Sequence, residues 1–325
     1  MTGNPSLATA AASSQRVYAA ADGLLARRGR SFHWARRLLS ERHAERATRL
    51  YGFCRRIDDV VDAATDAAAA HAALAVIRRA LQTGECEDAE TADMLQLMRV
   101  CLIEPAIPLE LTAGVESDLG DVRISDMDEL LHYCYRVAGT VGLMMTAALD
   151  VRAPEALPHA IDLGIAMQLT NICRDVRDDA LMGRRYLPAT LVGPLEPTLL
   201  VDPTDAVRAT VVDALRLLLD TADHYYASGE RGLSCLPAGA RAGILVAARL
   251  YRGIGTVLRE RDFDCWTSRA QVGTARKAVI TLRALAATAS ERFSDAVRTQ
   301  PGPAHGAVRP KHPVAARAAG NGVGD

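Results

Sequence analysis

Two acidic clusters with the same internal spacing are the most informative feature of the sequence. In each cluster two aspartates stand four residues apart, Asp58 with Asp62 and Asp175 with Asp179. Residues four apart share one face of a helix. Like charges at this spacing destabilise a helix by about 0.2–0.5 kcal/mol per pair, so we expect both pairs to have a compensating partner.

Carboxylate pairs that face each other across a helical bundle are suited to hard divalent cations. Magnesium takes one or two carboxylates, keeps several waters and completes its shell with phosphate oxygens of a substrate. An arginine stands close upstream in both clusters, Arg55 and Arg174, and guanidinium groups bind phosphate oxygens in bidentate fashion. The clusters therefore predict a metal–diphosphate site, in which the metal acts as a Lewis acid.

The same spacing also has a simpler interpretation. A single D-x-x-x-D pattern on a helix is often a solvated face that carries salt bridges. Arg55 with Asp59 and Arg174 with Asp178 are i,i+4 pairs of that kind. Two copies inside apolar helices favour the metal site, and both interpretations stay open at this point.

A segment rich in small residues, YCYRVAGTVGLMM, follows from Tyr133 to Met145. Glycine costs a helix up to about 1 kcal/mol relative to alanine, so Gly139 and Gly142 need a reason. One interpretation is tight packing of two helices. The other is room for a long apolar ligand, with methionines as an adaptable lining. Next to a metal–diphosphate site, such a groove predicts a prenyl diphosphate as substrate.

The elements that position these residues are predicted to be helices. Alanine and leucine are abundant and aromatic residues make up only 4% of the chain, which favours helices over strands. Asp126 with Glu129 forms a predicted helix-capping pair, and residues 192–203 are predicted to be a loop. Helical spacing of apolar residues predicts helices over residues 17–27, 31–39, 41–61, 67–82, 92–103, 109–119, 126–149, 160–181, 205–228, 238–261 and 271–297.

The chain is predicted to form one all-α domain of residues 16–298. Residues 1–15 are small and polar, and residues 299–325 are rich in proline, glycine and alanine. Both ends are therefore predicted to be disordered tails.

Charge and cysteine content exclude several classes of protein. A formal net charge of −1 argues against a nucleic-acid binder that works by bulk electrostatics. No apolar run reaches the roughly 18–20 residues that span a bilayer, and no secretory signal is evident. Seven scattered cysteines without a C-x-x-C motif indicate neither a disulfide framework nor a zinc site. We expect a cytoplasmic protein.

Three segments resemble the signature regions of the squalene/phytoene synthase family. They are YGFCRRIDDVVD (51–62), YCYRVAGTVG (133–142) and AMQLTNICRDVRDDALMGRRYLP (166–188). Their order and spacing match the family, and the resemblance extends over most of residues 20–295. It implies an isoprenoid synthase-type helical bundle with a central cavity. It also implies magnesium-dependent head-to-head joining of two prenyl diphosphates, with manganese as an alternative ion.

The resemblance implies a role for particular residues. The metal ligands would be Asp58, Asp62, Asp175 and Asp179, and the catalytic residues Tyr51, Tyr133, Arg55 and Arg174. The substrate-binding residues would be Arg28, Arg30, Ser31, Phe32, Gly142, Gln168, Asn171, Tyr251 and Arg269. Arg30 stands where relatives often have lysine, which keeps the charge and changes the hydrogen-bond geometry. The spacing near Tyr251 and Arg269 differs slightly from the family pattern.

The resemblance is strongest to bacterial members that make phytoene from two molecules of geranylgeranyl diphosphate through a cyclopropyl diphosphate, in carotenoid biosynthesis. One alternative is squalene or dehydrosqualene formation from farnesyl diphosphate, with NADPH needed only for squalene. Another is a non-catalytic assembly factor of the same fold, which would be expected to have lost the aspartates. The final base stays open between the released diphosphate, Tyr51 and Tyr133. A water-insoluble product predicts peripheral contact with the cytoplasmic membrane and a downstream desaturase as a partner.

Overall fold

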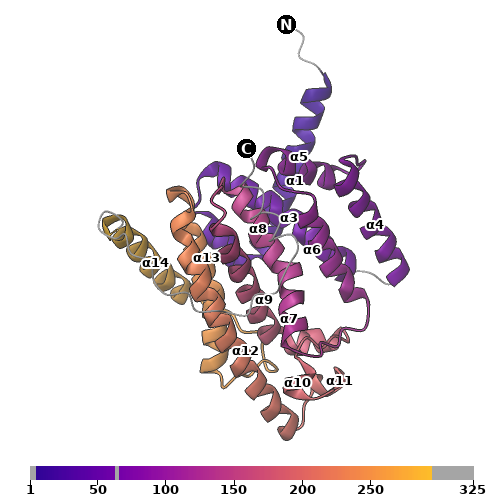
Figure 1. Cartoon of the computed structure of the whole chain (residues 1–325), viewed down its shortest axis with the longest axis vertical. Helices are drawn as coiled ribbons and strands as arrows, with labels where there is room; N and C mark the ends of the chain where they lie inside the picture. Colours follow the sequence, from indigo (N-terminus) through magenta and orange to yellow (C-terminus); the bar gives the residue numbers. More distant parts are fainter. Residues whose placement is uncertain (1–4, 63–65, 295–325) are drawn as a thin grey trace, which may run out of the picture.

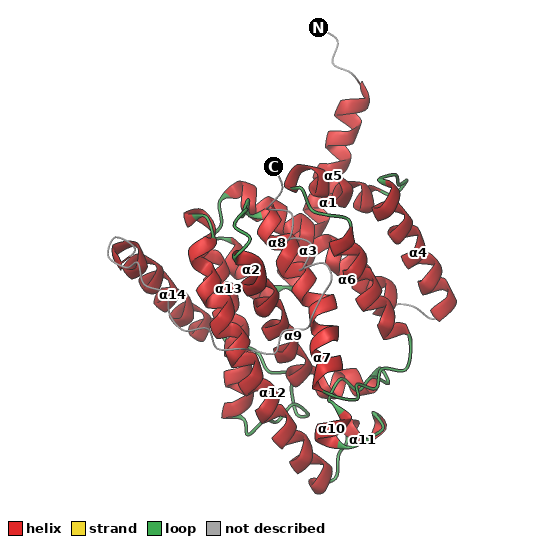
Figure 2. Cartoon of the chain, in the orientation of Figure 1, coloured by secondary structure: helices red, strands yellow, loops and turns green. Residues whose placement is uncertain are grey.

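The structure, a computed structural model, describes residues 5–62 and 66–294. Across these residues the backbone forms helices joined by loops, and no β-strand (Figure 2). The one β-type backbone pairing among these residues is an isolated β-bridge between Arg123 and Arg185. The all-α prediction is therefore confirmed.

The helices follow one another along the chain with short connections (Figure 1). Their bounds are α1 (Pro5–Arg28), α2 (Arg30–Arg36), α3 (Glu41–Asp62), α4 (Ala67–Thr83), α5 (Ala89–Cys101), α6 (Ala106–Glu116), the 3-10 turn η1 (Ser117–Leu119), α7 (Met127–Cys134), the π-helical turn η2 (Tyr135–Gly139), α8 (Thr140–Ala148), α9 (Ala156–Leu181), α10 (Ala189–Val192), α11 (Thr198–Val201), α12 (Asp205–Arg231), the 3-10 turn η3 (Gly232–Cys235), α13 (Ala238–Glu260) and α14 (Thr274–Ser294). None of the described helices is both long and apolar enough to cross a membrane.

Helix α9, which carries the second acidic cluster, is the central element of the bundle (Figure 1). It packs against α8, η2, α12 and α13. Ile165, Leu169 and Ile172 on its buried face are almost fully excluded from solvent. Each such side chain contributes roughly 1.5–3 kcal/mol when it is buried. The helix is therefore held firmly in place along most of its length.

Helix α3, which carries the first acidic cluster, is anchored in the same way. Leu50, Phe53, Ile57 and Val61 are buried at helical spacing, and α3 packs against α1, α5 and α8. Because this apolar face is fixed in the core, the face that carries the charged residues is held in one orientation.

The N-terminal region differs from the prediction. Helix α1 begins at Pro5, where we expected a disordered tail over residues 1–15. The physical reason is local composition, because the segment is rich in alanine, which has the highest intrinsic helix propensity. Residues 1–4 and the predicted C-terminal tail of residues 299–325 lie outside the described residues.

The stretch 126–149 is not the single α-helix that was predicted. Asp126 caps α7 as expected, since its side chain accepts a hydrogen bond from the Glu129 amide. Residues Tyr135–Gly139 then form a π-helical turn before α8 begins. A π-helical turn holds more residues than an α-helical one. The 3.6-residue periodicity therefore cannot be carried from Tyr133 across to Gly142.

The predicted loop 192–203 also contains a short helix. Helix α11 lies within it and packs against α9. Leu200 on α11 is only 1% exposed. Burial of a leucine also removes nearby backbone groups from water. In a helical turn these groups form hydrogen bonds with one another.

Candidate active site

A cavity of about 1020 Å³ runs beside α9. The α9 residues that line it recur every three or four positions from Ala156 to Arg174, so one face of the helix forms the wall. Residues of α2, α3, α8 and α13 form the other walls. The volume is at the upper end of the range for small-molecule sites, roughly 300–1,000 Å³. It suits a large, elongated ligand.

The first acidic cluster lies at one end of this cavity. Arg55 bonds to Asp59 through Nε at 2.9 Å and Nη2 at 2.6 Å. Arg28 bonds to the same carboxylate at 2.7 Å. Arg55 is also 3.8 Å from Asp58 and 3.5 Å from Asp62. The Arg55–Asp59 pair of the simpler interpretation is thus present, and the same guanidinium lies beside both predicted metal ligands.

Asp58 lines the cavity directly. Burial raises the pKa of its carboxyl to about 7, against the opposing effect of Arg55 and with a further contribution from Asp62. A carboxyl with so high a pKa has too little positive charge around it. Such a group is suited to a ligand that brings positive charge with it.

The second acidic cluster contains a kink. Helix α9 departs from helical geometry at Asp175, where φ is −107° and ψ is 15°. The Asp175 carboxylate accepts two 2.8 Å hydrogen bonds from Arg269 and pairs with the adjacent Arg174. Asp179 lies beyond the kink, and burial raises its pKa well above the ordinary value, with the charge of Asp175 adding to the effect. The two aspartates therefore have different environments.

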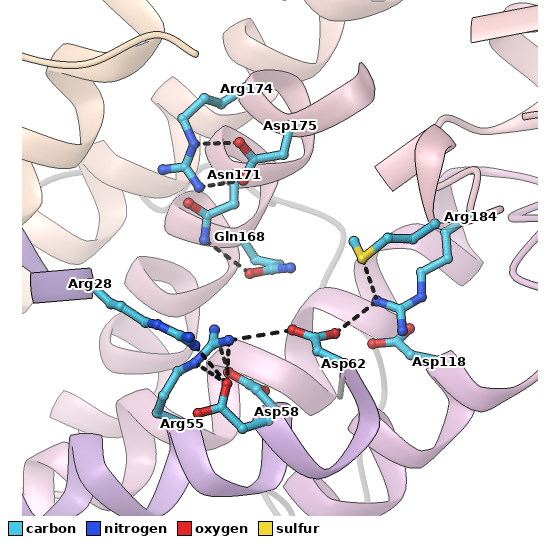
Figure 3. A network of polar contacts seen from close by, with 12 residues as sticks. Arg28, Arg55, Asp58, Asp62, Asp118, Gln168, Asn171, Arg174, Asp175 and Arg184 are labelled. Carbon is cyan, nitrogen blue, oxygen red and sulfur yellow. Dashed lines mark hydrogen bonds and ion pairs between the residues drawn. The ribbon is translucent and has the colours of Figure 1, made fainter. Parts of the chain in front are cut away.

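Asp118, on η1, acts electrostatically on both acidic clusters. The sequence did not predict it as a site residue. Its charge helps to raise the pKa of both Asp58 and Asp179. Beside it, Arg184 pairs with Asp62 at 3.2 Å (Figure 3). Arg184 lies in the third signature segment, which could have drawn attention to it. Asp118 lies in no motif, and nothing in its local sequence distinguishes it from a surface aspartate.

Aromatic residues form part of the cavity wall next to the charged end. Phe32 stacks on Tyr251 with ring centroids 4.8 Å apart and is 6.3 Å from the ring of Tyr51. Burial raises the pKa of Tyr51 to about 12, so its hydroxyl stays protonated at neutral pH. All three rings line the cavity and add aromatic surface to its wall.

All the residues predicted to bind substrate lie along the cavity, together with Tyr51, Arg55, Asp58 and Arg174. Arg269 reaches the site in spite of its unusual spacing. Asn171 donates a 3.2 Å hydrogen bond to Gln168. The buried Oδ1 of Asn171 has no hydrogen-bond partner among the described residues. An oxygen of this kind is available to a ligand.

Tyr133, one of the predicted catalytic residues, is not among the residues that line the cavity. It is only 9% exposed, its hydroxyl donates to Asp118 at 3.0 Å, and its ring stacks on Tyr186 with centroids 4.8 Å apart. The cavity wall instead begins at Val137, within the π-helical turn. The change of helical periodicity there separates Tyr133 from the cavity-facing residues.

Gly142 serves helix packing more than ligand space. A Cβ atom there would lie 2.2 Å from the carbonyl oxygen of Ala160, and one at Gly164 would lie 2.2 Å from that of Ala138. The backbone of α9 therefore touches that of α8 at Gly142 and that of η2 at Gly164. Of the two interpretations of the small-residue segment, tight packing applies at Gly142.

The residues fit a divalent metal ion by chemistry but are not gathered around one point. The donors are carboxylates and an amide oxygen, which hard cations prefer. Within the described part of the chain, no three acidic, histidine or cysteine side chains lie close enough together to hold an ion. Instead, Arg55 and Arg184 pair with Asp62 (Figure 3), and Arg269 pairs with Asp175. A metal would have to replace these guanidinium groups.

Comparison with known proteins agrees with this geometry. The model of the squalene/phytoene synthase family matches residues 25–281. The chain belongs to the squalene/phytoene synthase family. It is 32% identical over 278 residues to 15-cis-phytoene synthase from Enterobacter agglomerans, covering 82% of this chain and 94% of that relative. It is 37% identical over 256 residues to phytoene synthase from Cereibacter sphaeroides, covering 74% and 71%.

Solved structures show the same architecture. A dehydrosqualene synthase crystallised with a ligand superposes with a TM-score of 0.72 and 26% identity, covering 85% of this chain and 98% of that one. Squalene synthase HpnC from Alicyclobacillus acidocaldarius gives a TM-score of 0.66 at 19% identity, covering 77% and 95%, and shares the fold. The prediction of an isoprenoid synthase-type bundle is confirmed. This family member is a prenyltransferase.

Proposed function

We propose that this enzyme joins two molecules of geranylgeranyl diphosphate head to head and forms phytoene, in carotenoid biosynthesis. The observation that carries the proposal is the cavity: Asp58 and several arginines line it, Asp62 and Asp175 pair with two of those arginines, and the rest of its wall is largely apolar. The identity of 32–37% to relatives named phytoene synthase supports this product.

The charged end would bind the diphosphates together with magnesium, or with manganese as an alternative ion. Asp58, Asp62, Asp175 and Asp179 would hold the metal. The metal, when bound, neutralises the diphosphate and stabilises its departure. Arg28, Arg55, Arg174 and Arg269 lie at the same end of the cavity and would bind the remaining phosphate oxygens.

The reaction proceeds through carbocations that the cavity protects. One diphosphate leaves, and the allylic cation is attacked by the double bond of the second molecule, which then loses a proton to give a cyclopropyl diphosphate. The second diphosphate leaves, the cation rearranges, and loss of another proton gives phytoene. The rings of Phe32, Tyr51 and Tyr251 offer π-faces that attract cations, and the apolar wall excludes water.

The released diphosphate is favoured as the final base. Burial raises the pKa of Tyr51 to about 12 and that of Tyr133 well above its ordinary value. Both phenols are therefore protonated at neutral pH. The final base must accept a proton, and a protonated phenol is poorly suited to that role. Tyr133 also lies off the cavity wall, with its hydroxyl bonded to Asp118.

The direct test is product analysis. Purified protein is incubated with magnesium and either geranylgeranyl or farnesyl diphosphate, with and without NADPH, and the hydrocarbon is identified by mass spectrometry. Phytoene from geranylgeranyl diphosphate without NADPH is the expected result. Squalene that forms only with NADPH would overturn the proposal.

Two alternatives are separated by the same experiment. The likeness to a dehydrosqualene synthase structure favours farnesyl diphosphate as the second candidate substrate, and dehydrosqualene without NADPH would support it. A non-catalytic assembly factor would give no hydrocarbon. The presence of all four aspartates argues against this last alternative.

We also propose that the enzyme contacts the cytoplasmic membrane peripherally, where a downstream desaturase could take up the insoluble product. Helix α14 exposes Val279, Leu282 and Leu285, and its first turn, at Thr274 and Lys277, lines the cavity. Co-sedimentation with anionic phospholipid vesicles tests this contact, and Leu282→Glu should weaken it. A wild-type protein that stays in the supernatant would contradict it.

A further inference from the structure

The loop of residues 262–273, between α13 and α14, carries one of the arginines that the proposed function assigns to diphosphate binding. Its Arg269 donates two 2.8 Å hydrogen bonds to Asp175, although the Arg269 side chain is 52% exposed. Residues 270–273 line the cavity directly after it. Holding a long, exposed side chain in one geometry costs conformational entropy. The two-bond contact therefore needs a backbone that already directs Arg269 toward Asp175.

The loop begins with an unusual stretch of backbone that is held in place. Asp262 and Phe263 both have positive φ, 51° and 62°, which is uncommon for residues other than glycine. The Phe263 amide donates a 2.8 Å hydrogen bond to the carbonyl oxygen of Leu258, so the chain leaves α13 in a defined direction. Arg261 donates a 3.2 Å hydrogen bond to Ser268, but both side chains are exposed. That contact closes the loop on itself and does not hold it against the bundle.

Trp266 anchors the next part of the loop to the helical bundle. Its indole Nε1 donates a 2.9 Å hydrogen bond to the carbonyl oxygen of Leu200, on the short helix α11 that packs against α9. The guanidinium carbon of Arg208 lies 4.3 Å from the centre of the indole ring, in a cation–π contact. The backbone amide of Trp266 also donates to the Asp264 carboxylate at 3.0 Å. The indole therefore connects the loop, through α11, to the helix that carries Asp175.

Arg269 is flanked by anchored residues. Trp266 lies three residues before it, and Ala270, directly after it, is 1% exposed. Phe263 and Cys265 are buried as well, but apolar burial has no preferred direction. A hydrogen bond specifies both a distance and an angle. The indole bond is therefore the contact that sets the orientation of the loop just before Arg269.

We propose that Trp266 is a positioning residue, which holds the loop 262–273 so that Arg269 is aligned with Asp175 in the resting enzyme and with a diphosphate when substrate binds. This inference rests on the proposed function, in which Arg269 binds a diphosphate, and deepens it. A planar guanidinium group binds carboxylates and phosphates in the same two-bond geometry. A loop that aligns Arg269 with Asp175 therefore also presents it correctly to phosphate oxygens.

The test combines Trp266→Phe with Arg269→Ala in a double-mutant cycle. Phenylalanine keeps an aromatic ring next to Arg208 and lacks the indole donor. Binding of geranylgeranyl thiolodiphosphate, a non-reactive analogue, is measured by calorimetry with magnesium present. Trp266→Phe should weaken binding by about two- to tenfold, the usual net effect of one hydrogen bond. In the Arg269→Ala background the same substitution should have no effect, because Trp266 acts only through Arg269.

Two results of this cycle would overturn the proposal. One is equal weakening by Trp266→Phe in both backgrounds, which would indicate a general loss of structure. The other is unchanged binding when Arg269 is present. If Trp266→Phe does not fold, Arg208→Gln replaces it, because this change removes the cation from the face of the indole. It should give a smaller effect that again disappears with Arg269→Ala, and an effect that persists there, or no effect at all, is equally contradictory.

The matched control is Trp34→Phe, at the other of the two tryptophans of the chain. The Trp34 indole donates a 2.9 Å hydrogen bond to Thr281 on α14, and Trp34 is not among the residues that line the cavity. This substitution removes an indole hydrogen bond of the same length at a place that does not hold Arg269. Any change in binding should therefore be the same in both backgrounds. A coupling with Arg269 as large as that of Trp266 would count against the positioning role.

The proposed function and the positioning role fail separately. The first is judged by phytoene formation in the wild type, and the second by the coupling between Trp266 and Arg269. If the wild type does not bind the analogue, the coupling is measured by denaturant unfolding of the wild type, the two single variants and the double variant without ligand. The contact of Arg269 with Asp175 depends on the same loop there, so the effects should not add. Additive effects would overturn the positioning role, whatever product the enzyme makes.

Discussion

The hydroxyl of Tyr133 donates a 3.0 Å hydrogen bond to the carboxylate of Asp118. The other oxygen of that carboxylate accepts a 2.8 Å bond from Tyr186. Asp118 thereby ties α7 and the segment after α9 to the turn η1. In this arrangement Tyr133 contacts Asp118 and is not among the residues that line the cavity.

Tyr133→Phe should therefore destabilise the protein. The substitution leaves a buried carboxylate with one donor fewer, which typically costs about 1.5–3 kcal/mol of unfolding free energy. Denaturant unfolding of Tyr133→Phe, Asp118→Asn and the double variant measures the coupling between them. Purely additive effects would show that the hydrogen bond carries no stability of its own.

Asp58→Asn and Asp175→Asn should each abolish turnover and leave the helix content unchanged. If both carboxylates hold metal, the loss should exceed the roughly 10–100-fold effect that is typical of residues one layer further from a metal. The matched control is Asp178→Asn, because Asp178 lies on the same helix and is exposed. Product formation and circular dichroism are measured together, and retained activity in either variant would count against the metal role.

Metal affinity should depend on pH through Asp58. Burial raises the pKa of this carboxyl to about 7, and protons compete with metal ions for a carboxylate. The apparent magnesium affinity should therefore rise as the pH rises through about 7, as measured by the metal dependence of turnover about one unit on either side of that pKa. An affinity that does not change across this interval would contradict the prediction.

The raised pKa of Asp58 also determines how the unfolding free energy of the metal-free protein changes with pH. A chelating buffer keeps the protein free of metal for this measurement. The folded state holds the Asp58 proton up to about pH 7, whereas the unfolded state releases it near the ordinary value of 3.8. Between these values the folded state binds more protons, so the contribution of Asp58 to the unfolding free energy falls as the pH rises. Asp58→Asn should remove that part of the pH dependence.

Gly164→Ala should destabilise the contact between the turn η2 and α9. The new Cβ would lie 2.2 Å from the carbonyl oxygen of Ala138, and forced overpacking typically costs about 1–3 kcal/mol. Since alanine is the better helix former, a lower melting temperature can come only from the clash. Gly120→Ala is the control, because its Cβ would meet nothing closer than 3.8 Å; equal effects in the two variants would refute the argument.

Much of the fold follows from local patterns. The predicted helices 41–61 and 238–261 correspond to α3 and α13 within one residue at each end, because each has an apolar face at regular spacing. The kink at Asp175 could not be predicted in this way, since the Asp175 carboxylate is held by Arg269, far along the chain. The π-helical turn could not be predicted from local patterns either, because it adjoins the close α8–α9 contact at Gly142.

The candidate site was predictable where its residues carry a motif. The four aspartates have a repeated spacing, and an arginine stands close upstream of each pair, which together point to diphosphate chemistry. Asp118 does not, because its importance comes only from the tyrosines and charges that the fold brings to it. Nor does spacing show that Tyr133 faces away from the cavity, since that depends on the helical turn that follows it.

The pairing of arginines with aspartates at the charged end has a consequence for the order of events. Without substrate, Asp62 and Asp175 are already paired with guanidinium groups that a pyrophosphate group would claim. A metal ion that bound alone would leave a guanidinium group without an ion-pair partner. A pyrophosphate group that bound alone would leave a carboxylate without one. Each therefore makes room for the other, and by linkage each must raise the affinity of the other by the same factor. In the resting enzyme these ion pairs are complete, and they open only when the metal ion and the pyrophosphate group bind together.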